Sequence, residues 1–427
     1  MANRDLFDVC KKYKDPELVK SFNLYPFFKS LSASDGPVVE YDGREIVMLG
    51  SNNYLGLTHH PRVMKAAHDA LERFGTGCTG SRFLNGNLSL HEQLEQELAE
   101  FTGKDDALVF SSGFLANSGA LSCLGSIKGA VVFSEAENHG SIIDGVRLAK
   151  GETRVFEDLD HLEQLMTDGD PDGEGWAHAL VVSDAVFSMT GRVMDVKRLA
   201  ELRRRFGFKL YLDDAHGLGV LGPQGRGTAA HYGVMDDIDV LFGTFSKSFA
   251  SLGGFVAGDK DVINYLRHHA RTVIFSAGLP PASVAAALES LRVMQEEPEI
   301  FERLWDNVEY FRNGLHDIGF DTMGSWTPIL PLYVGPESIA FRFVKDALDM
   351  GVFATPVIYP AQPYQQALIR TSVTPSLTRD HLDKALDVLR VLHGKYDVPV
   401  FDAETAPEAN FMDWSYLTRT PKRRSAA

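Results

Sequence analysis

The feature that most constrains the fold is a series of short apolar segments that alternate with helix-like stretches between residues 107 and 243. Continuous apolar runs of this length are typical of strands that are buried on both faces. Their alternation with helices predicts a mostly parallel sheet covered by helices on both sides, and therefore an α/β fold. The predicted strands are Ala107–Phe110, Ala130–Phe133, Ala179–Ser183, Lys209–Leu212 and Val240–Gly243.

The segments before this series are also readable. Apolar spacing predicts helices over Pro61–Phe74 and Leu88–Phe101. Asp42-Gly43 is a strong turn pair and predicts a hairpin between Val38–Tyr41 and Ile46–Leu49.

The pattern changes beyond about residue 290. A helical stretch at Phe301–Ile318 precedes short strands near Ile329–Val334 and Leu368–Val373, which indicates a smaller α+β domain. We therefore predict an N-terminal segment at 1–60, a large domain at 61–290, a small domain at 291–400 and a loosely ordered tail at 401–427.

Composition excludes several classes of protein. The formal net charge of −16 argues against a nucleic-acid binder, which needs a basic face. The three cysteines match no metal site, so we expect no metal and a reduced compartment. Neither a signal peptide nor an apolar run long enough to span a membrane is visible, so we expect a cytoplasmic protein with at most peripheral membrane contact.

A lysine at the end of a predicted buried strand is the first candidate for chemistry. Lys247 stands in GTFSKS at 243–248, with the hydroxyls of Thr244 and Ser246 beside it and two glycines beyond. A lysine amine forms a Schiff base with an aldehyde cofactor, and the hydroxyls could hold that cofactor's phosphate. The alternative is a strand-end lysine that reaches solvent.

A second element lies upstream in LYLDDAHG at 210–217. An acid at the carboxyl end of a buried strand stands where α/β sheets bind ligands. Pyridoxal phosphate (PLP) needs a carboxylate against its pyridine nitrogen, and Asp213 is the candidate, with His216 for the ring hydroxyl. The alternative is a helix cap at Asp214 and a packing histidine.

Two further turns complete the pattern. FSSGFLAN at 110–117 passes from a strand into a helix, where the backbone N–H groups of Gly113 and Phe114 could bind a phosphate. ENHGS at 137–141 places His139 after the next strand, where it could stack on the pyridine ring or simply be structural.

Taken together, these motifs resemble the α-oxoamine synthase family of fold-type I PLP enzymes. SNNYLGL at 51–57, DDAHGLG at 213–219 and GTFSK at 243–247 carry the likeness, which extends from about residue 20 to 395. The resemblance implies a large domain with a mostly parallel seven-stranded sheet and a smaller C-terminal α+β domain. It also implies a homodimer with its active sites at the interface.

The resemblance assigns roles residue by residue. Lys247 would carry the cofactor and remove the Cα proton, and His139 would stack on the ring and orient the substrate carboxylate. Ser188, in VFSM at 186–189, would contact the cofactor oxygen. Arg370, in LIRT at 368–371, would bind the carboxylate of the amino acid, for which a bidentate guanidinium is suited. Asn52 is a second candidate for that carboxylate.

Some segments are most similar to the bacterial serine palmitoyltransferases within the family. They are GTGCTGSRFLNG at 75–86, SIIDG at 141–145, RTVIFS at 271–276 and PAQP at 360–363. This branch implies condensation of L-serine with a long-chain acyl-CoA, such as palmitoyl-CoA. Glycine or alanine as the amino acid, a shorter acyl chain and a carrier-bound acyl chain stay open, as do a PLP aminotransferase and a non-catalytic subunit.

The chain also departs from the family pattern. Asp214 stands where a glutamate is usual, and TPSLT at 374–378 replaces the usual segment ending in His-Thr. Relatives place a hydroxyl from the partner subunit near the phosphate, but this chain has Ala277 there, which leaves Ser276 as the substitute.

Overall fold

The computed structural model describes residues 5–34, 36–170, 173 and 175–398, and these fall into two compact units. The larger unit consists of Asn52–Asp306 and Thr374–Ser376. The smaller one takes the other described residues, which are those up to Ser51, Asn307–Val373 and those from Leu377 onward. The boundaries predicted at residues 60, 290 and 400 stay predictions, and the predicted tail at 401–427 lies outside the described residues.

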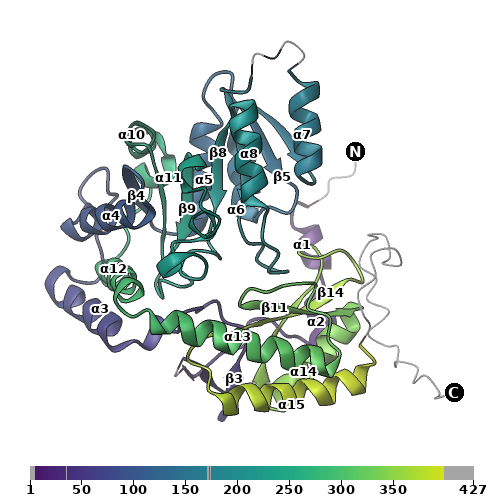
Figure 1. Cartoon of the computed structure of the whole chain (residues 1–427). Coiled ribbons are helices and arrows are strands. Elements are labelled where there is room, and N and C mark those ends of the chain that lie inside the picture. The colour runs from purple at the N-terminus through teal and green to yellow at the C-terminus, as the bar shows by residue number, and fades with distance from the viewer. Residues whose placement is uncertain (1–4, 35, 171–172, 174, 399–427) are drawn as a thin grey trace. The chain divides into compact units, whose positions relative to one another are not determined.

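A seven-stranded sheet organises the larger unit (Figure 1). The strand order is β4-β10-β9-β8-β7-β5-β6, and β10 alone runs against its neighbours. This confirms the predicted mostly parallel sheet of the fold-type I architecture. The strands are β4 (Asp106–Phe110), β5 (Val131–Glu135), β6 (Glu152–Phe156), β7 (Ala179–Asp184), β8 (Lys209–Asp213), β9 (Val240–Thr244) and β10 (Gly254–Gly258).

Helices connect these strands, as crossovers between parallel strands require. Several begin with a side-chain cap; Ser112, Asp158 and Asp195, for example, each accept a backbone N–H of the first turn. The helices are α3 (Pro61–Phe74), α4 (Ser89–Thr102), α5 (Gly113–Leu124), α6 (Gly140–Leu148), α7 (Leu159–Asp168), α8 (Val196–Phe206), α9 (Thr228–His231), α10 (Lys260–His269), α11 (Arg271–Ile274) and α12 (Pro281–Glu296), with 3₁₀ turns at Leu57–His59, Pro223–Gly225 and Met235–Asp237.

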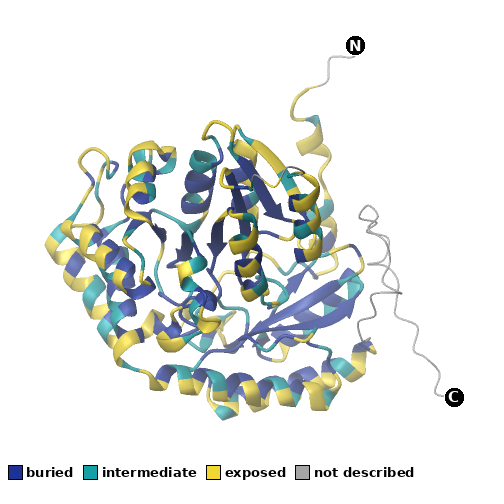
Figure 2. Ribbon diagram, turned by 45° about the horizontal axis from the view of Figure 1, so that its top comes forward, coloured by how far each residue is buried: buried dark blue, intermediate teal, exposed yellow. Residues whose placement is uncertain are grey.

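The core of this unit covers both faces of the sheet. Apolar residues of α5, α6 and α10 form one cluster with Val182, Tyr211 and Phe242 of the strands. Leu210 and Leu212, which point to the opposite face, are also fully buried. Figure 2 accordingly shows these strands in the colour of buried residues.

The smaller unit holds two further sheets, with the orders β1-β2-β3-β12 and β11-β14-β13. Asp42 and Gly43 both have positive φ between β2 and β3, which is the geometry of the predicted hairpin turn. Its elements are α1 (Asp8–Lys12), α2 (Asp15–Ser21), β1 (Ala33–Ser34), β2 (Val38–Tyr41), β3 (Arg44–Met48), β11 (Ile329–Gly335), α14 (Glu337–Asp349), β12 (Val352–Phe353), β13 (Thr355–Val357), β14 (Ala367–Ser372) and α15 (Arg379–Tyr396), and α13 (Glu299–Ile318) begins in the larger unit and ends in this one.

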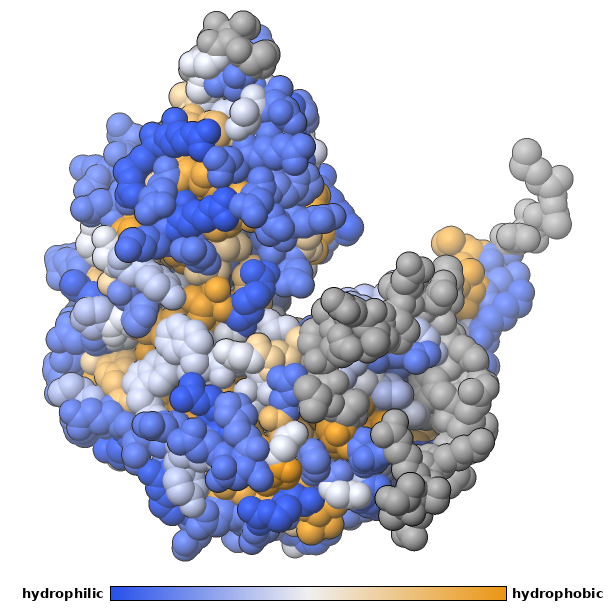
Figure 3. Space-filling model, turned by 45° about the vertical axis from the view of Figure 1, so that its right-hand side comes forward, coloured by the Kyte–Doolittle hydropathy of each residue, from blue (hydrophilic) through white to orange (hydrophobic). Residues whose placement is uncertain are grey.

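The surface is predominantly hydrophilic on the face drawn in Figure 3, with apolar residues in small patches. None of the helices formed by residues 5–34, 36–170 and 175–398 is both long and apolar enough to cross a membrane.

Candidate active site

The carboxyl edge of the large sheet brings most of the predicted residues together. Asp184 ends β7 and Asp213 ends β8, and the strand register pairs the two residues directly. Thr244 ends the neighbouring strand β9, and Lys247 follows it three residues later. Because the carboxyl ends of parallel strands meet at one edge, residues far apart in sequence converge there.

Lys247 lies in a chain of polar contacts with the predicted His216. Its Nζ is 2.8 Å from His216 Nε2, and His216 Nδ1 is 2.7 Å from the hydroxyl of Tyr54. That hydroxyl also lies 3.1 Å from Oδ1 of Asn52, so the predicted residue Asn52 belongs to the same group. The lysine amine is therefore held at the sheet edge rather than extended into solvent.

The carboxyl group of Asp213 is buried and accepts two hydrogen bonds. Asn117 Nδ2 donates to Oδ2 at 2.7 Å, and the backbone N–H of Ala215 donates to Oδ1 at 3.0 Å. Burial raises the pKa of this carboxyl, while the charge of Lys247 and the bond from Asn117 lower it. A cationic ring nitrogen placed here would find a carboxylate that is already oriented.

His139 follows β5 and caps the N-terminus of α6. Its Nδ1 accepts the backbone N–H of Ser141 at 3.2 Å, and its own backbone N–H donates to Asp184 Oδ2 at 2.8 Å. Burial lowers the pKa of the imidazole, so the ring is neutral near pH 7.

An anion cup lies at the N-terminus of α5. Ser112 caps this helix through a bond from Leu115 N, which leaves the first N–H groups of α5 to face the sheet edge. Gly113 is required there, since a Cβ would lie 2.7 Å from Thr244 Oγ1. The hydroxyls of Thr244 and Ser246 are 2.9 Å apart beside it.

The remaining predicted residues are placed differently. Ser188 lies in the loop after β7, in a turn closed by bonds between Phe187 and residues 191–192. Ser276 precedes Ala277, whose carbonyl accepts a bond from the hydroxyl of Ser111 next to the cup. Arg370 is buried in β14 of the smaller unit, where its Nη1 donates to Ser372 Oγ at 3.0 Å.

These groups suit the three functional parts of PLP. The amine of Lys247 matches its aldehyde, the carboxylate of Asp213 matches its ring nitrogen, and the α5 cup matches its phosphate. The close approach at Gly113 supports this fit, because a Cβ there would press against the Thr244 hydroxyl beside the cup.

Comparisons with known proteins define the class. Residues 44–389 match the family described as aminotransferase class I and II, and the protein belongs to that family.

Particular relatives narrow the assignment. A serine palmitoyltransferase from Bacteriovorax stolpii is 45% identical over 407 residues, which are 93% of this chain and 96% of that protein. An 8-amino-7-oxononanoate synthase from Thermoanaerobacter pseudethanolicus is 39% identical over 372 residues, which are 87% of this chain and 94% of that protein. A solved structure of "SPT with PLP internal aldimine" has a TM-score of 0.87 at 32% identity, covering 93% of this chain and 100% of that one.

The protein is therefore an α-oxoamine synthase, a PLP-dependent acyltransferase, as its motifs predict. Thr244, Ser246 and the α5 N-terminus would hold the phosphate, and Lys247 and Asp213 the reactive ring.

Four polar residues of this edge were not predicted as site residues. They are Tyr54, Asn117, Ser141 and Asp184. Asp184 gives the same signal as Asp213, an acid that ends an apolar strand. Asn117 is the only amide in the otherwise small and apolar helix Gly113–Leu124, and that isolation is its signal. Tyr54 and Ser141 lie inside quoted motifs without any distinguishing pattern.

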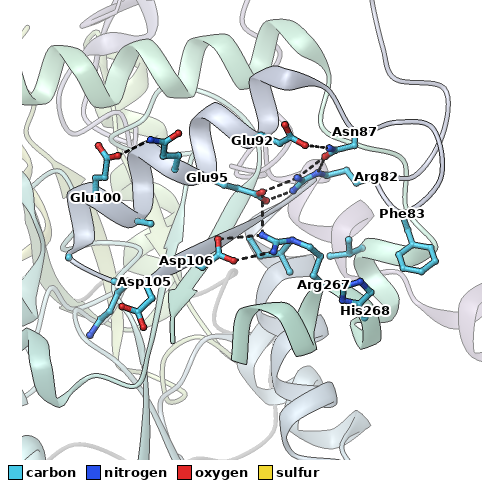
Figure 4. Close-up of a pocket in the computed structure, with 16 residues that line it drawn as sticks. Arg82, Phe83, Asn87, Glu92, Glu95, Glu100, Asp105, Asp106, Arg267 and His268 are labelled. Carbon is cyan, nitrogen blue, oxygen red and sulfur yellow. Dashed lines mark hydrogen bonds and ion pairs between the residues drawn. The ribbon is translucent and has the colours of Figure 1, made fainter. Parts of the chain in front are cut away.

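A separate cavity of about 770 Å³ lies at the start of β4 (Figure 4). Arg82 and Arg267 point toward the carboxylate of Glu95 in this view, and Asp106 pairs with Arg267. These ion pairs connect α4, β4 and α10 beside the cavity.

Proposed function

We propose that this enzyme condenses L-serine with a long-chain acyl-CoA, palmitoyl-CoA in the type case. The products are 3-ketodihydrosphingosine, CoA and CO₂, which makes this the first step of sphingolipid synthesis. The observation that carries the proposal is the 45% identity to a serine palmitoyltransferase along nearly the full length of both chains. The residues at the sheet edge support the proposal, because their amine, carboxylate and hydroxyl groups suit the cofactor chemistry of this reaction.

The chemistry divides between cofactor and protein. When bound, PLP supplies an aldehyde for attachment of the amino acid and a ring that accepts electrons. Asp213 keeps the ring nitrogen protonated, and the Lys247 amine takes the proton from the serine Cα. A Cα–C bond then forms at the thioester carbonyl, the C–S bond to CoA breaks, and the serine carboxylate leaves as CO₂. A proton from the site replaces it on Cα.

We also propose that Arg370 binds the carboxylate of the amino acid, with Asn52 as a second contact. A guanidinium binds a carboxylate through two parallel hydrogen bonds, which an ammonium cannot do. We therefore expect Arg370→Lys to raise the KM for L-serine by about tenfold or more, since a charged hydrogen bond contributes roughly 1.5–3 kcal/mol.

A homodimer in the cytoplasm completes the proposal. Loop 79–86 is bridged to residues 276–278 through Ser81 and Ala277, next to the cup. Leu84 and Phe275, on these two segments, are 79% and 71% exposed. Such apolar groups beside an active site suit the surface of a second copy, which could bring Ser276 to the phosphate of its partner.

A second candidate is another α-oxoamine synthase that uses glycine or alanine. The 39% identity to an 8-amino-7-oxononanoate synthase favours it, because the residues of the sheet edge described above do not by themselves select the amino acid.

The deciding experiment is an absorbance titration of the purified holoenzyme with L-serine, glycine and L-alanine, followed by palmitoyl-CoA and thiol detection. We expect L-serine to shift the band of the bound cofactor and palmitoyl-CoA then to release CoA. A preference for glycine or alanine would be consistent with the family assignment but would refute the serine assignment. Conversion of the cofactor to its amine form without need for a thioester would indicate an aminotransferase instead. Lys247→Ala is the control and should lack the band of the lysine-bound cofactor.

A further inference from the structure

Asn117 is a buried amide in an apolar helix, and it joins two parts of the site. Only 1% of its surface is exposed. Its Nδ2 donates to Asp213 Oδ2 at 2.7 Å and to Ser141 Oγ at 2.9 Å, while its Oδ1 accepts the hydroxyl of Tyr211 at 2.8 Å. All its polar atoms are thus engaged, which offsets the cost of burying them.

The orientation of this amide is fixed by its neighbours. A carboxylate only accepts hydrogen bonds, so the side of Asn117 that faces Asp213 must be the NH₂ group. Burial raises the pKa of Tyr211 well above its usual value, so its hydroxyl stays protonated and donates to Asn117 Oδ1. The second Nδ2 proton is then left for Ser141.

Ser141 carries the arrangement on to His139. Its Oγ accepts from Asn117, so its own proton is free to go to His139 Nδ1, which lies 2.7 Å away. The backbone N–H of Ser141 donates to the same nitrogen at 3.2 Å. With two donors aimed at it, Nδ1 cannot hold a proton, and the neutral imidazole must carry its proton on Nε2. Among the described residues, none forms a hydrogen bond with that Nε2.

We propose that Ser141 and Asn117 are positioning residues that fix His139 as the Nε2–H tautomer, so that it donates to the carboxylate of the bound amino acid, while the same Asn117 amide orients Asp213 toward the ring nitrogen. This inference rests on the proposed function, because it assigns the acceptor of His139 to an amino-acid substrate. The Asn117 amide would thereby orient both His139, at the substrate carboxylate, and Asp213, at the ring nitrogen of the cofactor.

The proposal predicts different effects for the loss of the Ser141 hydroxyl and the loss of the Asn117 amide. Loss of the Ser141 hydroxyl frees His139 to adopt the other tautomer but leaves the Asn117–Asp213 bond. Loss of the Asn117 amide disturbs both ends. Ser141→Ala should therefore affect amino-acid binding alone, whereas Asn117→Ala should affect amino-acid binding and PLP affinity.

The test measures binding by the absorbance of the bound cofactor, together with the ¹⁵N side-chain spectrum of His139. We expect Ser141→Ala to raise the dissociation constant of the amino acid about tenfold, since a hydrogen bond to a charged group is weakened. Its PLP affinity should match wild type. The double variant with Asn117→Ala should lose less than the product of the two single losses, because both act on one network. Ser122→Ala is the matched control, since the Ser122 hydroxyl donates only to the backbone of the same helix.

Two results would overturn the proposal. One is a wild-type spectrum in which His139 carries its proton on Nδ1. The other is amino-acid binding by Ser141→Ala that equals the binding by Ser122→Ala. Should Asn117→Ala not fold, the wild-type tautomer and Ser141→Ala decide the question without it.

Failure of the proposed function would be recognised separately. Each titration uses whichever of L-serine, glycine and L-alanine shifts the wild-type band, so a wrong choice of substrate does not affect the comparison of variants. If none of the three shifts the band, the synthase function itself fails, while the tautomer of His139 is still measured.

Discussion

Asp184 and Asp213 lie side by side at the sheet edge, and two carboxyl groups this close do not both ionise readily. Asp184 and Asp213 are register partners, and burial raises the pKa of each. The charge of Asp213 raises the pKa of Asp184 further, and the charge of Lys247 lowers the pKa of both carboxyls. Asp213 also accepts from Asn117 and the Ala215 N–H, which favour its ionised form. The pKa of Asp184 is raised more strongly than that of Asp213, so we assign the negative charge of the pair to Asp213.

This division predicts unequal effects of two similar substitutions. Asp213→Asn removes the charge that we propose lies opposite the ring nitrogen. We expect CoA release to slow by about 10²–10³-fold, the usual scale for losing one oriented electrostatic group. Asp184→Asn keeps an oxygen for the His139 N–H and should cost far less. Stopped-flow thiol detection on both holoenzymes makes the comparison, and equal losses would contradict the assignment of the charge to Asp213.

Asp214 makes folding stability depend on pH. Both its oxygens accept from Thr228, through N and Oγ1 at 2.6 Å each, yet burial raises the pKa of the carboxyl to about 7. Between its unfolded pKa of about 4 and this value, the folded state binds more protons than the unfolded state. The stability that the raised pKa contributes is therefore full below about pH 4 and is lost as the pH rises through 7.

We expect Asp214→Asn to flatten this dependence. The amide can accept from Thr228 N and donate to its hydroxyl, and it does not ionise. The Tm of wild type should fall relative to that of the variant between pH 5 and pH 8, as followed by circular dichroism. Asp168→Asn, at an exposed position at the end of α7, serves as the control. Parallel Tm curves for wild type and Asp214→Asn would count against the raised pKa.

The sequence singled out candidate residues whose type and place are both unusual. Lys247 and Asp213 are charges that follow or end apolar strands, and such placement has few explanations other than a ligand. Ser141 and Tyr54 could not be recognised, because a serine after a helix start or a tyrosine in a loop is ordinary, and only the folded chain brings them to His139 and His216. Side chains that act through a neighbour leave little trace in a linear pattern.

At the scale of elements, burial on both faces separates the strands that the sequence predicted from those that it did not. The interior strands β7, β8 and β9 read as apolar runs because helices cover both their faces. The edge strand β6 is largely exposed, with the sequence ETRVF, and so gives no apolar signal. β10 begins at Gly254, which must be glycine because a Cβ would lie 2.7 Å from the Gly113 Cα, and glycine at a strand start reads as a turn.

A buried ion pair connects β4, the strand that leads into the anion cup, to its neighbours. Glu95 of α4 accepts from Arg82 (Figure 4). It also accepts the backbone N–H of Val109 in β4 at 2.7 Å. The guanidinium of Arg82 also donates to Val109 O at 3.1 Å. Loop 79–86, α4 and β4 are thereby tied together immediately before the strand enters the cup.

We expect Glu95→Ala to lower the free energy of unfolding by about 3–5 kcal/mol, because it leaves Arg82 buried without its carboxylate. Urea denaturation followed by fluorescence measures this change. Glu92→Ala, one turn earlier on the exposed side of α4, should cost less than about 1 kcal/mol. A cost for Glu95→Ala as small as that of the control would mean that solvent reaches Arg82 and replaces its partner.

At the scale of the whole molecule, the proposed dimer follows from where the exposed apolar groups lie. The chain carries a net charge of −16, so two copies repel each other at long range and need local apolar contact to associate. Leu84 and Phe275 offer such contact on two segments that the Ser81–Ala277 bridge holds together. Their place beside the cup explains why association and cofactor binding should be linked.

This linkage gives the last prediction. Phe275→Asp would place a carboxylate in the proposed interface, and burying an unpaired charge costs several kcal/mol, so we expect the dissociation constant of the dimer to rise by roughly 10²–10³-fold. Mass photometry across a dilution series would then detect monomer at concentrations where wild type is dimeric, and PLP would be lost from the same samples if Ser276 reaches the partner's phosphate. Leu148→Asp, at an equally exposed apolar position at the end of α6, is the matched control. If both variants dimerise like wild type, this surface does not join the subunits; if Phe275→Asp is monomeric but keeps its PLP, each cup binds the phosphate without help from its partner.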